Sequence, residues 1–308
     1  MKKNRSILLA LALLAGMYSC QKSGTVAPDA TPDNQNNTGS IQKHGLGAKL
    51  NPTAFKNMRH INFDEVRARM IKLGFQDKLP NAKLGGPAGL PTRLILNHPS
   101  IGDQGQTGTC VSWSAGWALS GTLNNEFPAA GVSNPRSPWY VYQKDHSAAG
   151  NCDPNDGMYL DAGLNILRDY GVPTYAADSY LGSPCTSPTA AQDLSASSDK
   201  IVNYAAVTTV NEIKTAISMR LPVILGFNVY TSFETAFSYG TTFKRISGQY
   251  LGGHAVCIVG YDDAKNAVLI QNSWGTGGGD PSNRGCVWID YSTITNPNLG
   301  AEMYSVWK

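Results

Sequence analysis

The chain has 308 residues, 42% of them hydrophobic and 9% aromatic, which is enough for two lobes built around a sizeable core. Its formal net charge is only +3 and no basic stripe with interleaved aromatic residues occurs, so we expect no nucleic-acid partner. The 32 glycines and the charged fraction of 15% favour a loop-rich globular enzyme.

The first 19 residues are expected to be a cleaved signal peptide. Three basic residues, Lys2, Lys3 and Arg5, precede the apolar residues 7–17, a run about half as long as the ~20 residues that span a bilayer. The segment resembles a bacterial lipoprotein signal that is cut before Cys20, whose thiol would carry the lipid. A plain secretory signal is the alternative, although no small-residue cleavage site lies near. We therefore expect an exported protein of the cell envelope, anchored to a membrane and facing the periplasm or the cell surface.

Residues 20–45 are rich in Ser, Thr, Pro, Asn and Gly and have almost nothing to bury, which predicts a disordered tether. In residues 46–89, Asn62 with Glu65 three positions later begins a predicted amphipathic helix that ends at Gly74. The compact domain is expected to begin near residue 90. Residues 46–89 are thus a linker or a short pro-segment, and the sequence leaves open whether they inhibit the domain.

The rest of the chain divides into a helical half and a β-rich half. Amphipathic patterns predict helices over residues 110–127, 137–145, 160–170 and 211–219. Short apolar runs between turn residues predict strands over residues 222–230, 254–261, 267–271 and 285–291. This order indicates an α+β fold with a helical lobe over about residues 103–205, a β lobe over about residues 206–308 and a cleft between them.

Cys110 stands where a glycine-rich loop turns into the first of these helices. A thiol at the first turn of a helix is favoured as thiolate, which makes Cys110 a candidate nucleophile. The alternative is a buried structural cysteine, and this loop alone does not decide between the two. A cysteine nucleophile needs a base with an orienting partner. His254 begins one predicted strand and Asn272 ends the next, so an antiparallel turn would bring these side chains together.

Four sequence blocks in this order resemble the papain-like (cathepsin-type) cysteine proteases over residues 90–308. His254 and Asn272 follow Cys110 by 144 and 162 residues, and the runs His-Ala-Val and Asn-Ser-Trp-Gly match the family's blocks. The resemblance implies a two-lobed fold with a helical N-terminal lobe and an antiparallel β-barrel-like C-terminal lobe. It also implies that Cys110 attacks the peptide carbonyl as a thiolate paired with the His254 imidazolium. Asn272 would orient the imidazole, and Gln104 would complete the oxyanion hole.

The resemblance implies a substrate-binding surface as well. Gly157 is expected to pair its backbone with the substrate, and Met158 to line an apolar pocket. Asp156, Gly253 and Trp274 belong to the same expected surface, with Trp274 also shielding the catalytic histidine from water. The alternative for Gly157 is a simple turn before a helix.

The chain departs from the family pattern in several places. Val111 and Gly278 stand where the family has tryptophans, and Gly253 stands where an acidic residue often precedes the histidine. Thr107 and Pro154 replace both cysteines of one family disulfide. None of these changes removes a reacting group, but they bear on the shape of the cleft.

The remaining cysteines indicate an oxidising compartment. The resemblance implies a disulfide between Cys152 and Cys185. Cys257 and Cys286 lie in predicted strands and are expected to be plain thiols, with a bridge between them left open. No zinc-binding spacing occurs, and we expect neither a metal nor another cofactor.

We expect a monomeric cysteine-type peptidase that acts on protein or peptide substrates, as an endopeptidase rather than an exopeptidase. One alternative is a cell-wall peptidase of the NlpC/P60 type, which shares the cysteine–histidine pair but lacks the Asn-Ser-Trp-Gly block. The other is a binding protein on an inactive protease scaffold, against which the intact catalytic positions argue.

Overall fold

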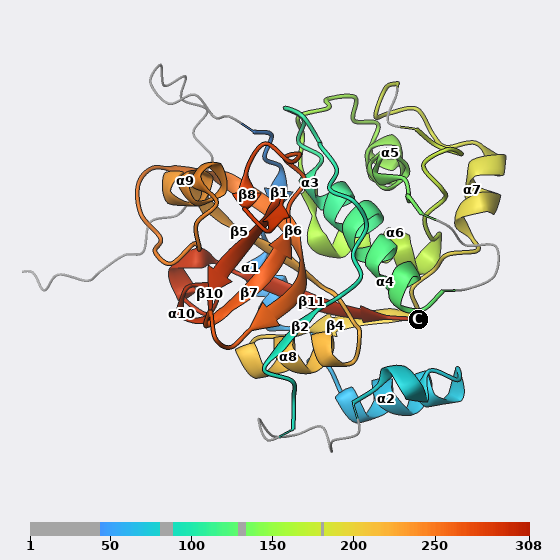
Figure 1. The fold of residues 1–308 in the computed structure, drawn as a ribbon. Helices are drawn as coiled ribbons and strands as arrows, with labels where there is room; N and C mark the ends of the chain where they lie inside the picture. The colour runs from blue at the N-terminus through green and yellow to red at the C-terminus, as the bar shows by residue number, and fades with distance from the viewer. Residues whose placement is uncertain (1–43, 81–88, 129–133, 180–181) are drawn as a thin grey trace, which may run out of the picture. The chain divides into compact units, whose positions relative to one another are not determined.

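The structure, a computed structural model, describes residues 44–80, 89–128, 134–179 and 182–308 (Figure 1). All of them belong to a unit that spans residues 42–308. The predicted signal peptide, Cys20 and most of the predicted tether lie outside the described residues. Within the described ranges, no helix is both long and apolar enough to cross a membrane.

An antiparallel sheet dominates the second half of the chain, as predicted. Its main path runs in the order β10 (Cys286–Asp290), β7 (Ala267–Gln271), β6 (Tyr250–Asp262), β5 (Val223–Tyr230), β11 (Glu302–Trp307) and β4 (Asn203–Ala206). A further strand, β2 (Arg93–Ile95), pairs with β6. In the described chain β10 and β4 do not pair with each other, so the sheet is open rather than a closed barrel, and the predicted α+β fold is confirmed.

Helices from the first half of the chain pack against this sheet. The predicted helix over residues 110–127 consists of α3 (Cys110–Ser112), a π-helical segment η2 (Trp113–Leu119) and α4 (Ser120–Glu126). The π-helical turns were not predicted; such turns are frequent at functional sites, and here they directly follow Cys110. The predicted helices α5 (Pro138–Ala149), α6 (Leu160–Asp169) and α8 (Val210–Ser218) are confirmed.

The other elements are short or were not predicted. They are β1 (Ala48–Lys49), α1 (Pro52–Lys56), η1 (Gln76–Lys78), β3 (Met158–Tyr159), α7 (Ala190–Ala196), α9 (Thr231–Tyr239), β8 (Gly279–Asp280), β9 (Asn283–Arg284), α10 (Tyr291–Ile294) and η3 (Pro297–Leu299). We call the described residues 44–80, which precede the predicted peptidase domain, the N-terminal segment. The predicted helix of this segment is α2 (Phe63–Lys72). Asn62 Oδ1 accepts from the Glu65 N–H at 3.2 Å, which is the predicted cap.

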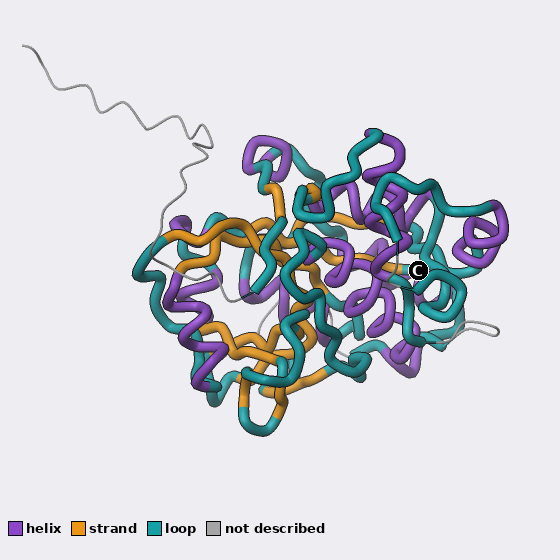
Figure 2. The backbone as a smooth tube through the Cα atoms, turned by 90° about the horizontal axis from the view of Figure 1, so that it is seen from above, coloured by secondary structure: helices purple, strands orange, loops and turns teal. Residues whose placement is uncertain are grey.

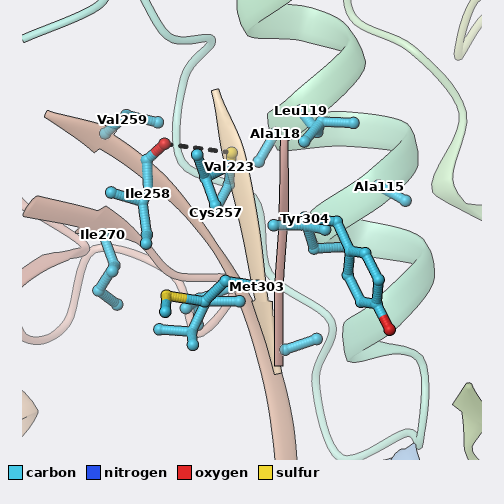
Figure 3. Close-up of a cluster of buried hydrophobic side chains, with 14 of the residues drawn as sticks. Ala115, Ala118, Leu119, Val223, Cys257, Ile258, Val259, Ile270, Met303 and Tyr304 are labelled. Atoms are coloured by element: carbon cyan, nitrogen blue, oxygen red, sulfur yellow. Dashed lines mark hydrogen bonds between the residues drawn. The ribbon is translucent and has the colours of Figure 1, made fainter. Parts of the chain in front are cut away.

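The main core lies between the η2 helix and one face of the sheet. Figure 3 shows Ala115 of η2 on the side of the sheet to which Tyr304 points, whereas Met303, the neighbour of Tyr304 on β11, points to the other face toward Ile270; all four side chains are buried. Figure 2 shows most strands gathered on one side of the described unit, beside the α3–α6 helices. This packing fixes the start of α3 against β6, and therefore fixes Cys110 relative to the strand that carries His254.

A buried ion-pair cluster joins the helical half to the end of the chain. Arg136, which is 1% exposed, pairs through Nε with Asp199 Oδ2 at 2.8 Å. Lys308 Nζ pairs with Asp199 Oδ1 at 2.7 Å, and Asn124 Nδ2 donates to Asp199 Oδ2 at 2.9 Å. The backbone carbonyl of Lys308 accepts from Arg69 Nε of α2 at 3.0 Å, so the N-terminal segment is tied to the same corner.

Candidate active site

Cys110 is the first residue of α3, at the end of the glycine-rich loop that the sequence singled out. Its side chain is fully buried, and the backbone N–H groups of Ala255 and Gly47 hydrogen-bond to its sulfur. Ala255 follows His254 on β6, so the thiol lies against the strand that carries the candidate base. The Gly108 N–H donates to Pro154 O at 3.0 Å, a backbone bond that joins the two loops where the resembled family has a disulfide.

His254 and Asn272 meet as the sequence predicts. β6 and β7 pair antiparallel with Cys257 opposite Gln271, which places His254 of β6 beside the residue that follows β7. His254 Nε2 and Asn272 Oδ1 are 2.8 Å apart. Because a carboxamide oxygen can only accept, Nε2 carries the proton and Nδ1 keeps its lone pair. Nδ1 is buried and has no hydrogen-bond partner among the described residues.

Trp274 covers the imidazole of His254. The two rings stack at 4.5 Å between centroids with 26° between their planes, and His254 is fully buried. Phe237 of the unpredicted helix α9 packs edge-on against Trp274 at 5.3 Å. A Cβ atom on Gly278 would lie 2.5 Å from Phe237 Cε1, so Phe237 fills the space at the position where the family has a second tryptophan. Trp274 and the α9 residue Phe237 therefore shield the histidine together, and only Trp274 was predicted from the sequence.

Gln104 faces the same centre with a fixed amide orientation. Ser273 Oγ donates to Gln104 Oε1 at 2.6 Å, which leaves Nε2 as the donor on the cleft side. That Nε2 donates to Thr107 O at 2.9 Å and to Gly45 O at 3.1 Å. A carbonyl oxygen of the N-terminal segment thus already occupies the donor that we expect to stabilise the oxyanion.

Residues 44–50, which we call the cleft segment, run through the site. The Gly47 N–H donates to Gly253 O at 3.0 Å, and Gly47 O accepts from the Met158 N–H at 2.9 Å. β1 of this segment pairs parallel with β3, with Ala48 opposite Met158. Two expected substrate residues, Gly253 and Met158, therefore contact the cleft segment through their backbones.

Glycine gives the cleft segment the space that it needs. A Cβ atom on Gly157 would lie 2.0 Å from Gly47 O, and a Cβ atom on Gly253 would lie 2.0 Å from Ala48 O. Any side chain at either position would force the segment out of the cleft. A cavity of about 540 Å³ remains beside the cleft segment and is lined by that segment together with both glycines.

The other two residues that we expect to bind substrate, Asp156 and Trp274, contact the two ends of the cleft segment. Asp156 pairs with Lys49 Nζ at 2.7 Å. The His44 ring stacks on Trp274 at 4.3 Å with 7° between the planes, on a tryptophan that also stacks on His254. His44 lies near the end of the predicted tether, and its ring is held by this stacking on Trp274.

Burial favours the neutral forms of both Cys110 and His254 in the covered site, whereas the resemblance implies a thiolate–imidazolium pair. Burial raises the pKa of the Cys110 thiol to about 12, although the N–H groups of Ala255 and Gly47 act in the opposite direction. Burial likewise lowers the pKa of the His254 imidazole to about 3, against the opposing hydrogen bond to Asn272. Both shifts arise because water is excluded from the charged forms beneath the cleft segment.

The remaining cysteines divide as expected. Cys152 and Cys185 form a disulfide, which confirms that prediction. Cys257 and Cys286 are free and buried, and both lie opposite Gln271 in register, on β6 and β10. Two strand spacings of about 4.8 Å separate them, which exceeds the Cα distance of about 7 Å that a disulfide can span. The bridge that the sequence left open is therefore not formed.

The sequence of the chain matches a known protein family and several known proteins. A family model described as papain family cysteine protease matches residues 96–302. The chain is 24% identical over 221 residues to an uncharacterized peptidase C1-like protein of Acanthamoeba polyphaga mimivirus, covering 66% of this chain and 68% of the viral protein. It is 30% identical over 185 residues to cysteine proteinase 1 of Entamoeba histolytica, covering 58% of this chain and only 57% of that protein.

A solved structure supports the fold. Xylellain, a cysteine protease from Xylella fastidiosa, matches with a TM-score of 0.67 over 88% of this chain and 99% of its own, at 21% sequence identity. At that identity the similarity establishes the papain-like fold and says nothing of the substrate.

Proposed function

Because the chain belongs to the papain family of cysteine proteases, we propose that it hydrolyses peptide bonds with Cys110 as the nucleophile. The observation that carries the proposal is the 2.8 Å contact between His254 Nε2 and Asn272 Oδ1, which leaves Nδ1 without a partner in the described chain. The thiol lies against the backbone of the next residue on the same strand. This arrangement supplies a nucleophile, a base and an orienting group in one buried cluster.

The proposed reaction proceeds by acyl transfer. The Cys110 proton passes to His254 Nδ1 as the sulfur attacks the peptide carbonyl carbon, and the oxyanion accepts from the Gln104 amide and the Cys110 N–H. His254 then gives this proton to the leaving amine, and the acyl group stays on the sulfur. Water next attacks the thioester with His254 as base, which releases the acid and restores the thiol.

We further propose that the N-terminal segment up to about residue 58 is an inhibitory pro-segment. The group that it presents to the Cys110 sulfur is the Gly47 N–H, not the carbonyl carbon that a nucleophile attacks. The Gly47 carbonyl is turned away and accepts from Met158. In this reading the covered chain is a latent enzyme, and removal of the segment readmits water and allows the thiolate–imidazolium pair to form.

The path of the cleft segment supports endopeptidase activity. The backbone of this segment runs from His44, which stacks on Trp274, past Cys110 to Lys49, which pairs with Asp156. The site therefore has room for a polypeptide on both sides of the nucleophile. The disulfide of Cys152 with Cys185 supports export to an oxidising compartment. Lipid attachment at Cys20 remains part of the proposal, and metabolic labelling with a palmitate analogue tests it.

The central test compares variants of the full-length chain before and after limited proteolysis. Trypsin can cut the segment after Lys56, which is exposed. Once the trypsin has been quenched, activity is measured with a peptidyl-coumarin substrate. We expect the uncut wild type to be latent and the cut wild type to be active. Cys110→Ala is expected to lower kcat/KM at least about a thousandfold after the same cut.

Cys257→Ala is the matched control, because Cys257 is also a buried free cysteine but lies in the core. It is expected to gain activity on cutting as the wild type does. Full activity of the cut Cys110→Ala variant would disprove the nucleophile assignment, and equal activity of cut and uncut wild type would disprove the inhibitory segment.

A further inference from the structure

One backbone carbonyl lies between the helix that begins at Cys110 and the strand that leads to Asn272. The chain between β2 and α3 passes between the helices and the sheet (Figure 1), and there Ser100 O accepts two side-chain hydrogen bonds. Trp117 Nε1 of η2 donates at 2.7 Å, and Gln271 Nε2 at the end of β7 donates at 3.1 Å. We call these two hydrogen bonds the Ser100 link.

Both donors lie close in the chain to groups that we expect to react. Gln271 is the last residue of β7 and directly precedes Asn272, whose Oδ1 is 2.8 Å from His254 Nε2. Trp117 belongs to η2, which continues the helix that begins at Cys110. The Ser100 link therefore joins the helix of the nucleophile to the strand of the orienting amide.

The amide of Gln271 is buried and is held by its donor end. The residue is 2% exposed, and its Nε2 also donates to Pro99 O at 3.2 Å. Its Oε1 has no hydrogen-bond partner among the described residues, and a buried acceptor without a partner costs stability. Pro99 O is also 2.9 Å from Nδ1 of the neighbouring His98, whereas Ser100 O is bonded by one helix residue and one strand residue. Ser100 O thus connects the helical half to the β-rich half of the chain.

The segment that the Ser100 link holds continues directly into the candidate active site. Two backbone hydrogen bonds of 2.9 and 3.0 Å pair residues 102–104 with residues 273–275 in antiparallel fashion. Gln104, the expected oxyanion donor, and Trp274, which covers the imidazole of His254, lie on the two sides of this short ladder. A displacement at Ser100 is therefore passed on to the groups around the reacting atoms.

We propose that Gln271 and Trp117 are positioning residues that act together, through Ser100 O, to fix the nucleophile relative to His254. Gln271 acts through the adjacent orienting amide, and Trp117 acts through the helix that carries the thiol. Because the two hydrogen bonds lie in series between helix and strand, loss of either one breaks the link. The assignment rests on the proposed peptidase function, in which small displacements of the reacting groups are costly.

The first test measures turnover of a peptidyl-coumarin substrate by the enzyme cut after Lys56. Gln271→Met and Trp117→Phe each remove one donor and keep a side chain of similar shape. Each is expected to lower kcat about tenfold and to leave KM within about twofold, because the reacting groups move whereas the binding surface does not. The double variant is expected to be at most about twofold slower than the slower single variant, because a link in series is broken only once. Losses that multiply to about a hundredfold in the double variant would show two independent roles and overturn the link.

Thr122→Val is the matched control for loss of stability. It removes a buried hydrogen bond, from Thr122 Oγ1 to Ala118 O at 2.7 Å, in the same run of helix as Trp117. It is expected to lower the stability to urea and to leave kcat unaltered. If kcat falls as far in this control as in Gln271→Met, the effect of Gln271 is one of general stability and the positioning role is rejected.

The second test needs no turnover and records the rate of Cys110 alkylation by iodoacetamide against pH in the cut enzyme. Pairing with His254 favours the thiolate, so the rate rises at a lower pH than for a free thiol. Each single variant is expected to move this rise to higher pH by about half a unit, which is about a threefold loss of thiolate on the acid side. Trp117 is partly exposed, so Trp117→Phe decides this comparison even if Gln271→Met does not fold.

An unaltered alkylation profile in Trp117→Phe would contradict the positioning role. Absence of turnover by the cut wild type on every substrate would instead reject the proposed function, and the alkylation profile would still judge the Ser100 link.

Discussion

The pKa of Glu302 is shifted in opposite directions by its two neighbours, Asp161 and the Asn51 N–H. Its carboxyl is buried beside Asp161 of α6, and both burial and this neighbouring acid favour the protonated form, whereas the Asn51 N–H favours the ionised form. Tyr304 lies two residues along β11, and burial with the charge of Glu302 raises the pKa of its phenol. The net effect is a folded-state pKa of about 7 for Glu302, against a reference value of 4.5.

This shift predicts a dependence of stability on pH. A folded-state pKa above the unfolded one means that Glu302 contributes stability that is fully present below about pH 4.5 and is lost as the pH rises through about 7. Glu302→Gln removes the titration, so the variant is expected to be relatively more stable than wild type at pH 8 than at pH 4, by up to about 3 kcal/mol. Urea unfolding at the two pH values measures this, and an equal difference at both would contradict it.

The cleft segment depends on its glycines for space rather than for backbone conformation. A Cβ atom on Gly47 would lie 2.1 Å from Gly108 O, and one on Gly45 would lie 2.3 Å from Thr107 O. Neither residue has a positive φ. The element therefore fits the cleft only because its backbone can approach the loop before Cys110 closely.

Gly47→Val is expected to displace the cleft segment and expose the nucleophile. Overpacking of this kind costs about 1–3 kcal/mol, which corresponds to an increase of about tenfold or more in the rate of Cys110 alkylation. Gly277→Val is the matched control, because a Cβ atom there meets nothing within 4 Å. If Gly47→Val alkylates no faster than the control, the contact of the segment with the loop does not keep the cleft closed.

Elements with a local signal could be predicted from the sequence, and elements without one could not. The cap at Asn62 located α2, and uninterrupted apolar runs located β5, β6 and β7. α9 was missed because aromatic and β-branched residues fill it and its N-cap residue Tyr230 makes no side-chain cap. β1 has two residues and exists only through its pairing with β3, which no local pattern records.

The candidate site shows the same division. Cys110, His254 and Asn272 lie in motifs with recognisable neighbours, and the antiparallel turn between β6 and β7 follows from chain order alone. The cleft segment could not be placed, because Gly-Leu-Gly in a polar stretch looks like a linker and its partners are more than fifty residues away. Phe237 was missed for a related reason: its role follows from the packing of α9 against Trp274.

At the scale of the whole molecule, Asp199 links three distant parts of the chain. Its carboxylate pairs with Arg136 before α5 and with Lys308 at the C-terminus, and it accepts from Asn124 of α4. Arg136 and Asp199 are 1% and 3% exposed, so water cannot replace either partner. The corner in which helices and sheet meet is therefore held by a single acid.

Asp199→Asn is expected to destabilise the protein strongly. It leaves the buried guanidinium of Arg136 without its counter-charge, which costs about 3–5 kcal/mol when a buried pair is broken from one side. Asp169→Asn breaks the pair with Arg168, in which both side chains are more than a third exposed, and is expected to cost less than about 1 kcal/mol. Urea unfolding of both variants measures the difference, and similar losses would show that burial of the Asp199 pair is not decisive.

The N-terminal segment also covers the outer edge of the sheet, which is formed by β4. The Ile61 N–H donates to Ala206 O and the Ala206 N–H donates to Arg59 O, both at 3.0 Å, on the side of β4 that faces away from β11. An unpaired outer strand is a template for self-association. A maturation cut between Gly47 and Lys56 would free the nucleophile and leave this strand protected. Loss of the segment through residue 61 would uncover it, so the position of the cut also decides whether the active enzyme stays dispersed or aggregates.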